Sequence, residues 1–175
     1  IVTDHHQPGE ELPATPYIIN PNQRGCSYPN KGISGTGVAY KLAEALYRQI
    51  LGEGAEELLD LVALATLADM SPMNAENRHL VRRGLRLLEQ GAGSPGLVSL
   101  LHRASLLGEP LTSMDILFKV TPLNNSAGRL AGPETALKLL LATDVTEAEK
   151  FAAELFELNE KRKQLDRGVT TEAEA

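Results

Sequence analysis

Three consecutive side chains of types that bind metals, Asp4, His5 and His6, are the residues best placed to do chemistry. They follow the β-branched run Ile1-Val2-Thr3 and precede Pro8-Gly9, so a strand is expected to end and a loop to begin here. Open α/β sheets place their ligand sites at the C-terminal ends of strands. Carboxylate and imidazole together suit Mn²⁺, Zn²⁺ or Fe²⁺. The triplet therefore predicts a metal site, with three ordinary polar residues at a strand end as the alternative.

Another carboxylate, Asp69, ends a nearly all-apolar run from Leu61 to Ala68 and precedes Ser71-Pro72. The helix dipole disfavours an anion at a helix C-terminus, and burial of the carboxylate would add a desolvation cost. A bound cation would offset both costs. We therefore interpret Asp69 as a second metal ligand, with a solvated residue at a helix end as the alternative.

Two segments could contact phosphate groups. The turn from Gly32 to Gly37 contains Ser34 and Gly35 and opens a helix, where backbone N–H groups can face an anion. Close helix packing, or Ser34 acting as a helix cap, is the plainer interpretation. The segment from Asn124 to Arg129 reads as a polar loop between helices, and Arg129 could hold a phosphate by two hydrogen bonds. A surface arginine is the alternative there.

The elements that position these residues follow from apolar spacing. Short strands are expected at Ile1–Thr3 and Tyr17–Ile19, before a mostly helical remainder. One expected helix carries four arginines, which we interpret as a solvated face, with a DNA-backbone patch as the alternative: Arg78, Arg82, Arg83 and Arg86. The expected helices are 36–52, 55–68, 77–89, 96–106, 112–119, 133–142 and 146–167.

Composition narrows the class of protein. The single cysteine, Cys26, excludes a disulfide within the chain and favours a reducing cytoplasm. A net charge of −6 excludes a surface that is basic all over, so nucleic-acid contacts must come from a local patch. Aromatic residues make up 4%, which argues against a broad base-stacking platform. The longest apolar stretch is interrupted by Asp60, which argues against a membrane span.

Taken in order, these motifs resemble those of the RecJ exonucleases, a branch of the DHH phosphoesterase superfamily. The matching segments, in chain order, are Val2 to Pro8-Gly9, Asn20-Pro21-Asn22, Ser34 to Ala39, Leu61 to Pro72, Asn77-Arg78, Asn125 to Leu130 and Asn159 to Arg162. The resemblance implies an α/β fold. Residues 1–143 would form the C-terminal part of a DHH phosphoesterase domain, with short parallel strands followed mostly by helices. Residues 144–175 would form a long connecting helix towards a missing C-terminal domain.

The resemblance also implies an activity: metal-dependent hydrolysis of phosphodiester bonds in single-stranded DNA, from 5′ to 3′, in DNA repair and recombination. The cofactor would be a pair of Mn²⁺ or Mg²⁺ ions. His5 and Asp69 would bind metal, His6 would contact the scissile phosphate, and Asp4 would support the site. Further contacts to substrate phosphate would come from Arg129, Ser34 and Gly35.

The family's aspartate-rich N-terminal motifs are not in this sequence, so we expect an interior fragment that is inactive alone. The expected partners are single-stranded DNA, the missing N-terminal and C-terminal segments of the parent chain, and a single-strand-binding protein or helicase, with no membrane. Two alternatives stay open. One is a DHH-family phosphodiesterase acting on short oligonucleotides, cyclic dinucleotides or pyrophosphate. The other is a non-catalytic RecJ-like scaffold in a replication complex, which retention of His5, His6 and Asp69 argues against.

Overall fold

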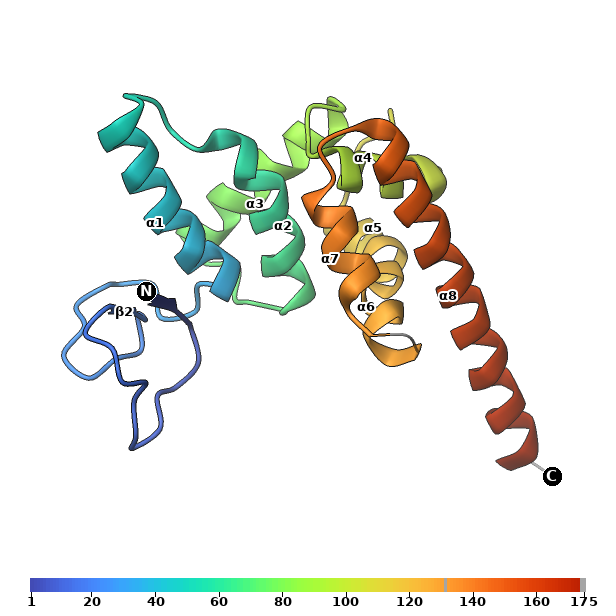
Figure 1. Ribbon diagram of the computed structural model, residues 1–175, viewed down its shortest axis with the longest axis horizontal. Coiled ribbons are helices and arrows are strands. Elements are labelled where there is room, and N and C mark those ends of the chain that lie inside the picture. Colours follow the sequence, from blue (N-terminus) through green and yellow to red (C-terminus); the bar gives the residue numbers. More distant parts are fainter. Residues whose placement is uncertain (131, 174–175) are drawn as a thin grey trace. The chain divides into compact units, whose positions relative to one another are not determined.

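In the computed structural model, two short parallel strands lie side by side near the start of the chain (Figure 1). They are β1 (Val2–Thr3) and β2 (Ile18–Ile19), in the register Val2 opposite Ile18 and Thr3 opposite Ile19. The structure describes residues 1–130 and 132–173, with the side chains of 129, 130 and 168–173 outside that description. Parallel pairing brings the C-terminal ends of both strands, and the polar residues that follow each, to the same edge.

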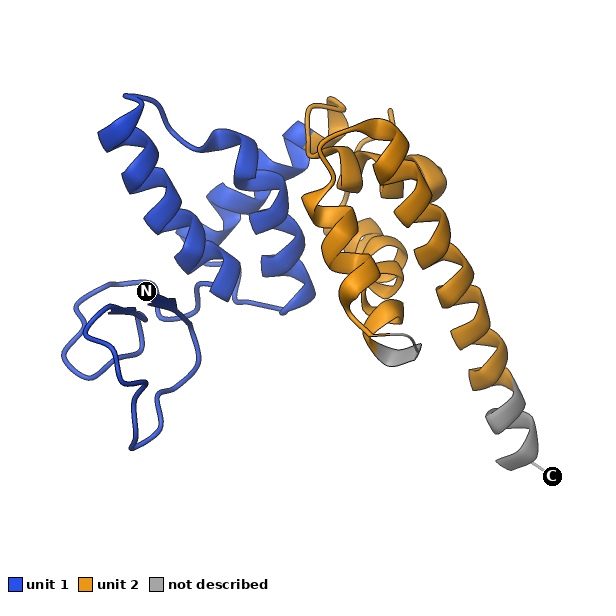
Figure 2. Cartoon of the chain, viewed as in Figure 1, with its two compact units in different colours: residues 1–87 blue, residues 88–175 orange. Residues whose placement is uncertain are grey.

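Contacts divide the chain into two compact units, residues 1–87 and 88–175 (Figure 2). The first unit contains α1 (Gly35–Ile50), the 3₁₀ turn η1 (Glu56–Leu58), α2 (Leu59–Ala68) and most of α3 (Ala75–Glu89). Helix α2 is apolar on nearly every side, and that composition is typical of a helix surrounded by other elements. One core cluster of this unit consists of Tyr40, Ala55, Leu59, Val62 and Leu80.

Gly84 allows α3 to approach α2 very closely. A Cβ atom at position 84 would overlap the Leu59 carbonyl group and the Ala63 side chain. The absence of a side chain at Gly84 therefore lets the two backbones touch. This contact holds the first half of α2 against the second half of α3.

The second unit is helical throughout its described elements. It comprises α4 (Pro95–Arg103), α5 (Ser113–Asp115), the π-helix η2 (Ile116–Val120), α6 (Thr121–Leu130), α7 (Glu134–Leu141) and α8 (Val145–Ala173). The first half of α8 packs on α4, α6 and α7, and its residues Ala148, Ala152 and Leu155 are fully buried. Farther along α8, Leu165 is exposed.

The predicted fold class is confirmed: short parallel strands at the start precede a mostly helical chain that ends in a long helix. The compact units meet at residues 87 and 88, whereas the sequence suggested a boundary at 143 and 144. The two units are defined by contacts within the chain and not by family boundaries. The assignment of residues 1–143 to a family domain therefore stays a prediction. No helix in the described ranges combines the length and apolar character needed to cross a membrane.

The predicted loop from Asn124 to Arg129 is wrong, because these residues lie inside helix α6. Ile116, Val120, Leu123 and Ala127 are buried at spacings of four and three residues, which continue one apolar stripe from η2 into α6. The polar residues between them concealed that stripe in the sequence. Ser126 fits inside because its hydroxyl donates to the Leu123 carbonyl at 2.6 Å.

Candidate metal centre

The triplet Asp4, His5 and His6 begins where β1 ends, as the sequence predicted. The Asp4 N–H donates to the Ile19 carbonyl at 3.0 Å, so the backbone stays paired with β2 up to the first residue of the triplet. One ligand atom from each of the three side chains lies within 4.8 Å of the others. The end of a short paired strand thus gathers two imidazoles and a carboxylate in one place.

Asp4 orients the His6 ring. Its Oδ1 atom accepts a hydrogen bond from His6 Nδ1 at 2.8 Å and another from the His5 backbone N–H at 2.8 Å. The bond from the His6 side chain is the main reason why the pKa of Asp4 lies below its ordinary value, which keeps Asp4 ionised. With Nδ1–H donating to Asp4, the neutral His6 ring presents the lone pair of Nε2. His6 can therefore bind a metal or accept a proton at Nε2.

His5 faces Asp69, which comes from α2. Their Nδ1 and Oδ2 atoms are 3.7 Å apart, and the side chains are 21% and 47% exposed. Two ligands with bonds of about 2.1 Å to one ion lie roughly 3.0–3.4 Å apart. The predicted approach of His5 to Asp69 is therefore observed, and the pair needs to close by only a few tenths of an ångström to share an ion.

Asp69 caps the C-terminus of α2 in a tight turn. The N–H groups of Met70 and Ser71 donate to the carbonyls of Leu67 and Thr66, and Met70 has a φ of 49°. This pattern is a Schellman motif, in which glycine normally occupies the left-handed position. The Ser71 hydroxyl donates to Asp69 Oδ2 at 3.2 Å and holds the carboxylate. The expected burial cost at Asp69 is absent, because its side chain is half exposed, so only the helix dipole disfavours the anion here.

Gly35, the first residue of α1, provides room for the His5 ring. A Cβ atom at position 35 would lie 3.2 Å from His5 Cδ2 and 3.7 Å from His5 Nε2. The start of α1 therefore packs directly against the Cδ2–Nε2 edge of the imidazole. This contact limits movement of the ring towards α1.

Two asparagines that follow β2 hold the backbone of the triplet. The Asn20 side chain donates to the His6 carbonyl at 2.9 Å, and the Asn22 side chain donates to the His5 carbonyl at 2.7 Å. The Asn20 amide oxygen also accepts from the Asn22 backbone N–H at 2.8 Å, so the Asn20 side chain holds the backbone at Asn22 as well. In the sequence, Asn20 and Asn22 stand out only as part of a motif. Their spacing after a second strand end was the available signal for this supporting role.

The loop between β2 and α1 is attached to the start of α3 by a network of polar side chains. Asn30 donates to Asn77 Oδ1 at 2.8 Å and to Glu76 Oε2 at 2.9 Å, and it accepts from Asn74 at 2.6 Å. Asn77 is buried and donates to the carbonyls of Gly32 and Pro72, both at 2.8 Å. The loop that carries Asn22 is thereby tied to the turn that follows Asp69 and to the start of α3.

Glu76 is the anionic centre of this network. Burial raises its pKa, but hydrogen bonds from Tyr28, Asn30 and Lys41 outweigh burial and hold the pKa below its ordinary value. Burial, together with the hydrogen bond to Glu76, raises the pKa of Tyr28. Glu76 is therefore ionised and Tyr28 is protonated near neutral pH, and the network keeps its pattern of donors and acceptors.

The geometry at Ser34 favours the helix-cap interpretation. Its hydroxyl is buried, accepts from the Gly37 N–H at 3.1 Å and lies 3.0 Å from the Thr66 hydroxyl. The Ser34 side chain is thus occupied within the protein, and the geometry lends no support to its contacting substrate. The backbone N–H of Gly35, at the start of α1, keeps the position proposed for an anion contact. The side chain of Arg129 lies outside the described part of the structure.

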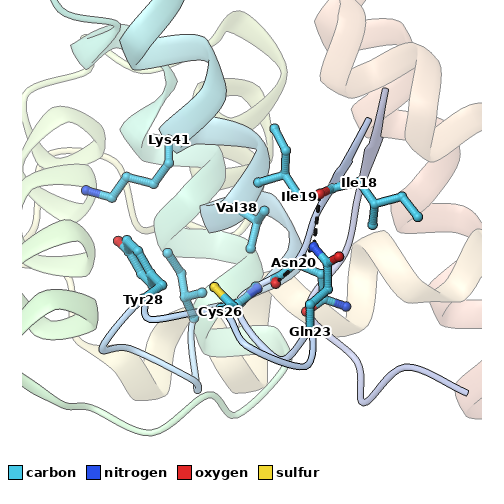
Figure 3. A pocket seen from close by; sticks show the side chains of 10 residues that line it. Ile18, Ile19, Asn20, Gln23, Cys26, Tyr28, Val38 and Lys41 are labelled. Atoms are coloured by element: carbon cyan, nitrogen blue, oxygen red, sulfur yellow. Dashed lines mark hydrogen bonds between the residues drawn. The ribbon is translucent and has the colours of Figure 1, made fainter. Parts of the chain in front are cut away.

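A cavity of about 240 Å³ lies behind β2 and is separate from the triplet. Figure 3 shows Ile18, Val38 and Cys26 among its walls, with Lys41 and Tyr28 at one end. Gln23 closes another side, where its side-chain amide donates to the Ile18 carbonyl at 2.9 Å. None of the metal-binding candidates lines this mainly apolar cavity, so it is distinct from the candidate metal centre.

Known proteins are similar to this chain in both sequence and fold. A family model described as "DHH family, N-terminal domain" matches residues 1–66. The single-stranded-DNA-specific exonuclease RecJ of Escherichia coli K12 is 41% identical over 184 residues, which cover 99% of this chain and 32% of that protein. The protein of the same name from Bacillus subtilis 168 is 41% identical over 174 residues, covering 99% of this chain and 21% of that protein.

Among solved structures, RecJ from Thermus thermophilus in complex with Mn²⁺ superposes with a TM-score of 0.84. It is 34% identical in sequence, and the match covers 98% of this chain and 25% of that chain. This chain spans a third or less of the length of these three relatives.

Proposed function

We propose that this chain belongs to the DHH family and forms part of a metal-dependent exonuclease that hydrolyses single-stranded DNA from 5′ to 3′. The observation that carries this proposal is the approach of His5 to Asp69, 3.7 Å apart, beside His6 and Asp4. These residues come from two segments far apart in the sequence, and each is held by its own supporting hydrogen bonds. The relatives reported above are named as exonucleases for the same substrate.

The donor set fits Mn²⁺ or Mg²⁺, with the imidazoles favouring Mn²⁺. His5 and Asp69 would hold one ion, and His6 has a ligand atom within 4.8 Å of one from His5. When bound, a divalent ion supplies an acidic water and positive charge for the phosphoryl oxygens. A pair of ions needs about six protein ligands in carboxylate-rich sites, and the other ligands would come from parts of the parent protein beyond this chain.

The residues of this chain would position the metal ligands and contact the substrate phosphates. Asp4 holds the His6 ring through Nδ1, and His6 would contact the scissile phosphate. Ser71 and Gly35 limit the movement of Asp69 and His5 respectively. The Gly35 N–H would face a phosphate oxygen at the start of α1, and Arg129 would contribute a second phosphate contact. We place the parent enzyme in the cytoplasm, in DNA repair and recombination.

The experiment is an assay of the full-length protein on 5′-phosphorylated single-stranded DNA with Mn²⁺. We expect His5→Ala and Asp69→Ala to lower turnover by at least about 100-fold. His102→Ala, which changes an exposed histidine of the second unit, should leave turnover unchanged. Normal turnover by His5→Ala would disprove the assignment of the metal centre.

Two further assays distinguish the proposed activity from the alternative substrates and test whether the site is complete in this chain. Parallel assays use cyclic dinucleotides, short oligonucleotides and pyrophosphate, and preference for any of these over long strands would replace the proposed substrate. Residues 1–175 alone should show no turnover, because His5 and Asp69 are the only firm ligands that we assign here. Comparable turnover by residues 1–175, abolished by His5→Ala, would show that the site is complete within this chain.

A further inference from the structure

Helix α3 carries a row of exposed arginines. Arg78, Arg82 and Arg86 follow one another at intervals of four residues, so they share one face of the helix. At 1.5 Å per residue, neighbouring arginines are about 6 Å apart along the axis and the row is about 12 Å long. His79 is also exposed and lies beside the first of them. We call Arg78, Arg82 and Arg86 the arginine row.

Carboxylates near α3 are engaged elsewhere. Glu76 pairs with Lys41 at 3.0 Å and accepts from Tyr28 and Asn30. Glu56 pairs with Arg83 at 2.5 Å, which removes the fourth arginine of the helix from the exposed row. Among the described residues, no carboxylate lies within 4.0 Å of any arginine in the row.

This concentration of positive charge contrasts with the rest of the chain. The net charge is −6, yet the row presents three charges of one sign without compensating acids in the described ranges. Arg78 donates from Nη2 to the Met73 carbonyl at 3.2 Å, which leaves most of its donors available. The row is therefore a local basic patch on a chain that is acidic overall.

We propose that the arginine row binds the phosphate backbone of a nucleic-acid strand. Arginine presents a planar fork of donors that matches phosphate oxygens, and repeated charge along a line suits a chain of phosphates. None of the exposed large hydrophobic residues in the described ranges belongs to α3, so this face lacks the apolar anchors that a membrane or a protein partner requires. Contacts of this type hold a strand without reading its sequence.

The row and the candidate metal centre belong to the same unit. Asn77, next to Arg78, donates to the Gly32 and Pro72 carbonyls in the network that supports the metal-binding residues. Under the proposed exonuclease function, on which this inference rests, the row would hold part of the substrate strand away from the bond being cut. Its effect should therefore depend on strand length.

The test uses full-length protein with the substitutions R78Q, R82Q and R86Q together, and Ca²⁺ in place of Mn²⁺ to prevent cleavage. Binding of single-stranded DNA is measured as a function of salt. Each neutralised phosphate contributes about 0.7 to the slope of log K against log salt, so the triple variant should lose about 2 units of slope. Between about 50 and about 200 mM salt, that difference amounts to roughly 16-fold in affinity.

The matched control is R48Q with K161Q and K163Q, which also removes three positive charges, two exposed and one partly exposed, outside α3. We expect the control to keep most of the slope. The inference is overturned if the triple variant keeps the wild-type slope, or if the control loses as much. Circular dichroism confirms that both variants are folded, which the exposure of the substituted residues leads us to expect.

Cleavage assays separate this inference from the proposed function. With Mn²⁺, the triple variant should cleave a dinucleotide at the wild-type rate and lose efficiency only on longer strands. Equal losses on both substrates would contradict a role away from the cut bond. If the wild-type protein cleaves no DNA, the proposed function fails, whereas the salt slope still reports whether the row binds phosphates.

Discussion

Replacing Gly35 with alanine should weaken metal binding without unfolding the protein. The added methyl group would lie 3.2 Å from His5 Cδ2. Carbon atoms in good contact are about 3.5–4.0 Å apart, so the His5 ring would have to move by roughly 0.3–0.8 Å. Metal sites tolerate deviations of about 0.2 Å in ligand distances. The displacement is therefore larger than the site can absorb.

The expected size of the effect follows from comparable changes around metal ligands. Altering a group that positions a ligand costs about 10- to 100-fold in metal affinity. Stability should hold, because Gly35 has no left-handed backbone conformation and alanine is the better helix former. The backbone N–H of residue 35 is also retained, so any phosphate contact made by that N–H persists.

Isothermal titration of Mn²⁺ into the full-length protein measures the change directly, with thermal unfolding as the test of stability. Gly54→Ala is the matched control, because a Cβ atom there would meet its nearest neighbours at an ordinary 3.6 Å. We expect Gly54→Ala to bind Mn²⁺ like the wild type. If Gly35→Ala also binds Mn²⁺ within about twofold of the wild type, packing by α1 does not position His5 and this reasoning is refuted.

Three further predictions concern stability. The lowered pKa of Glu76 means that its charge adds stability above the ordinary value of 4.5, and this is lost as the pH falls through the lower pKa of the folded state. Glu76→Gln should therefore flatten the acid-side fall in melting temperature, and an unchanged pH profile would contradict the role of its charge. Met70→Gly should raise the free energy of unfolding by about 1 kcal/mol in urea titrations, because it relieves a left-handed φ of 49° at an exposed residue. Gly84→Ala should lower it by about 1–3 kcal/mol, since the new methyl group overlaps the Leu59 carbonyl, whereas Gly128→Ala adds a methyl group in open space and should not be destabilising.

Much of the fold could be predicted from the periodicity of apolar residues. The strands at Val2–Thr3 and Ile18–Ile19 and the helices α1, α2 and α3 lie within a few residues of their expected positions. The error at Asn124 to Arg129 has a local cause. Polar residues dominate that segment, while its helical stripe begins upstream in η2, so a short window shows no periodicity.

The members of the candidate site were easier to predict than their supports. His5 and Asp69 are identifiable because each stands at the end of an apolar element. The roles of Asn20 and Asn22 depend on which backbone carbonyls come within reach after the strands pair, and sequence spacing does not specify those distances. Ser34 shows the converse: its hydroxyl could cap a helix or face a ligand, and its burial against Thr66 favours the cap.

The hydrogen-bond network centred on Asn30 has a consequence for the protein while it is being synthesised on the ribosome. Asn74, Glu76 and Asn77 lie 44 to 47 residues after Asn30. At about 5–20 residues per second, the ribosome needs roughly 2 to 9 s to add them. Throughout that interval the triplet from Asp4 to His6 is already synthesised, but the partners that anchor its supporting loop do not yet exist. A nascent chain stalled before residue 74 would therefore present the metal-binding triplet without the anchor of its supporting loop.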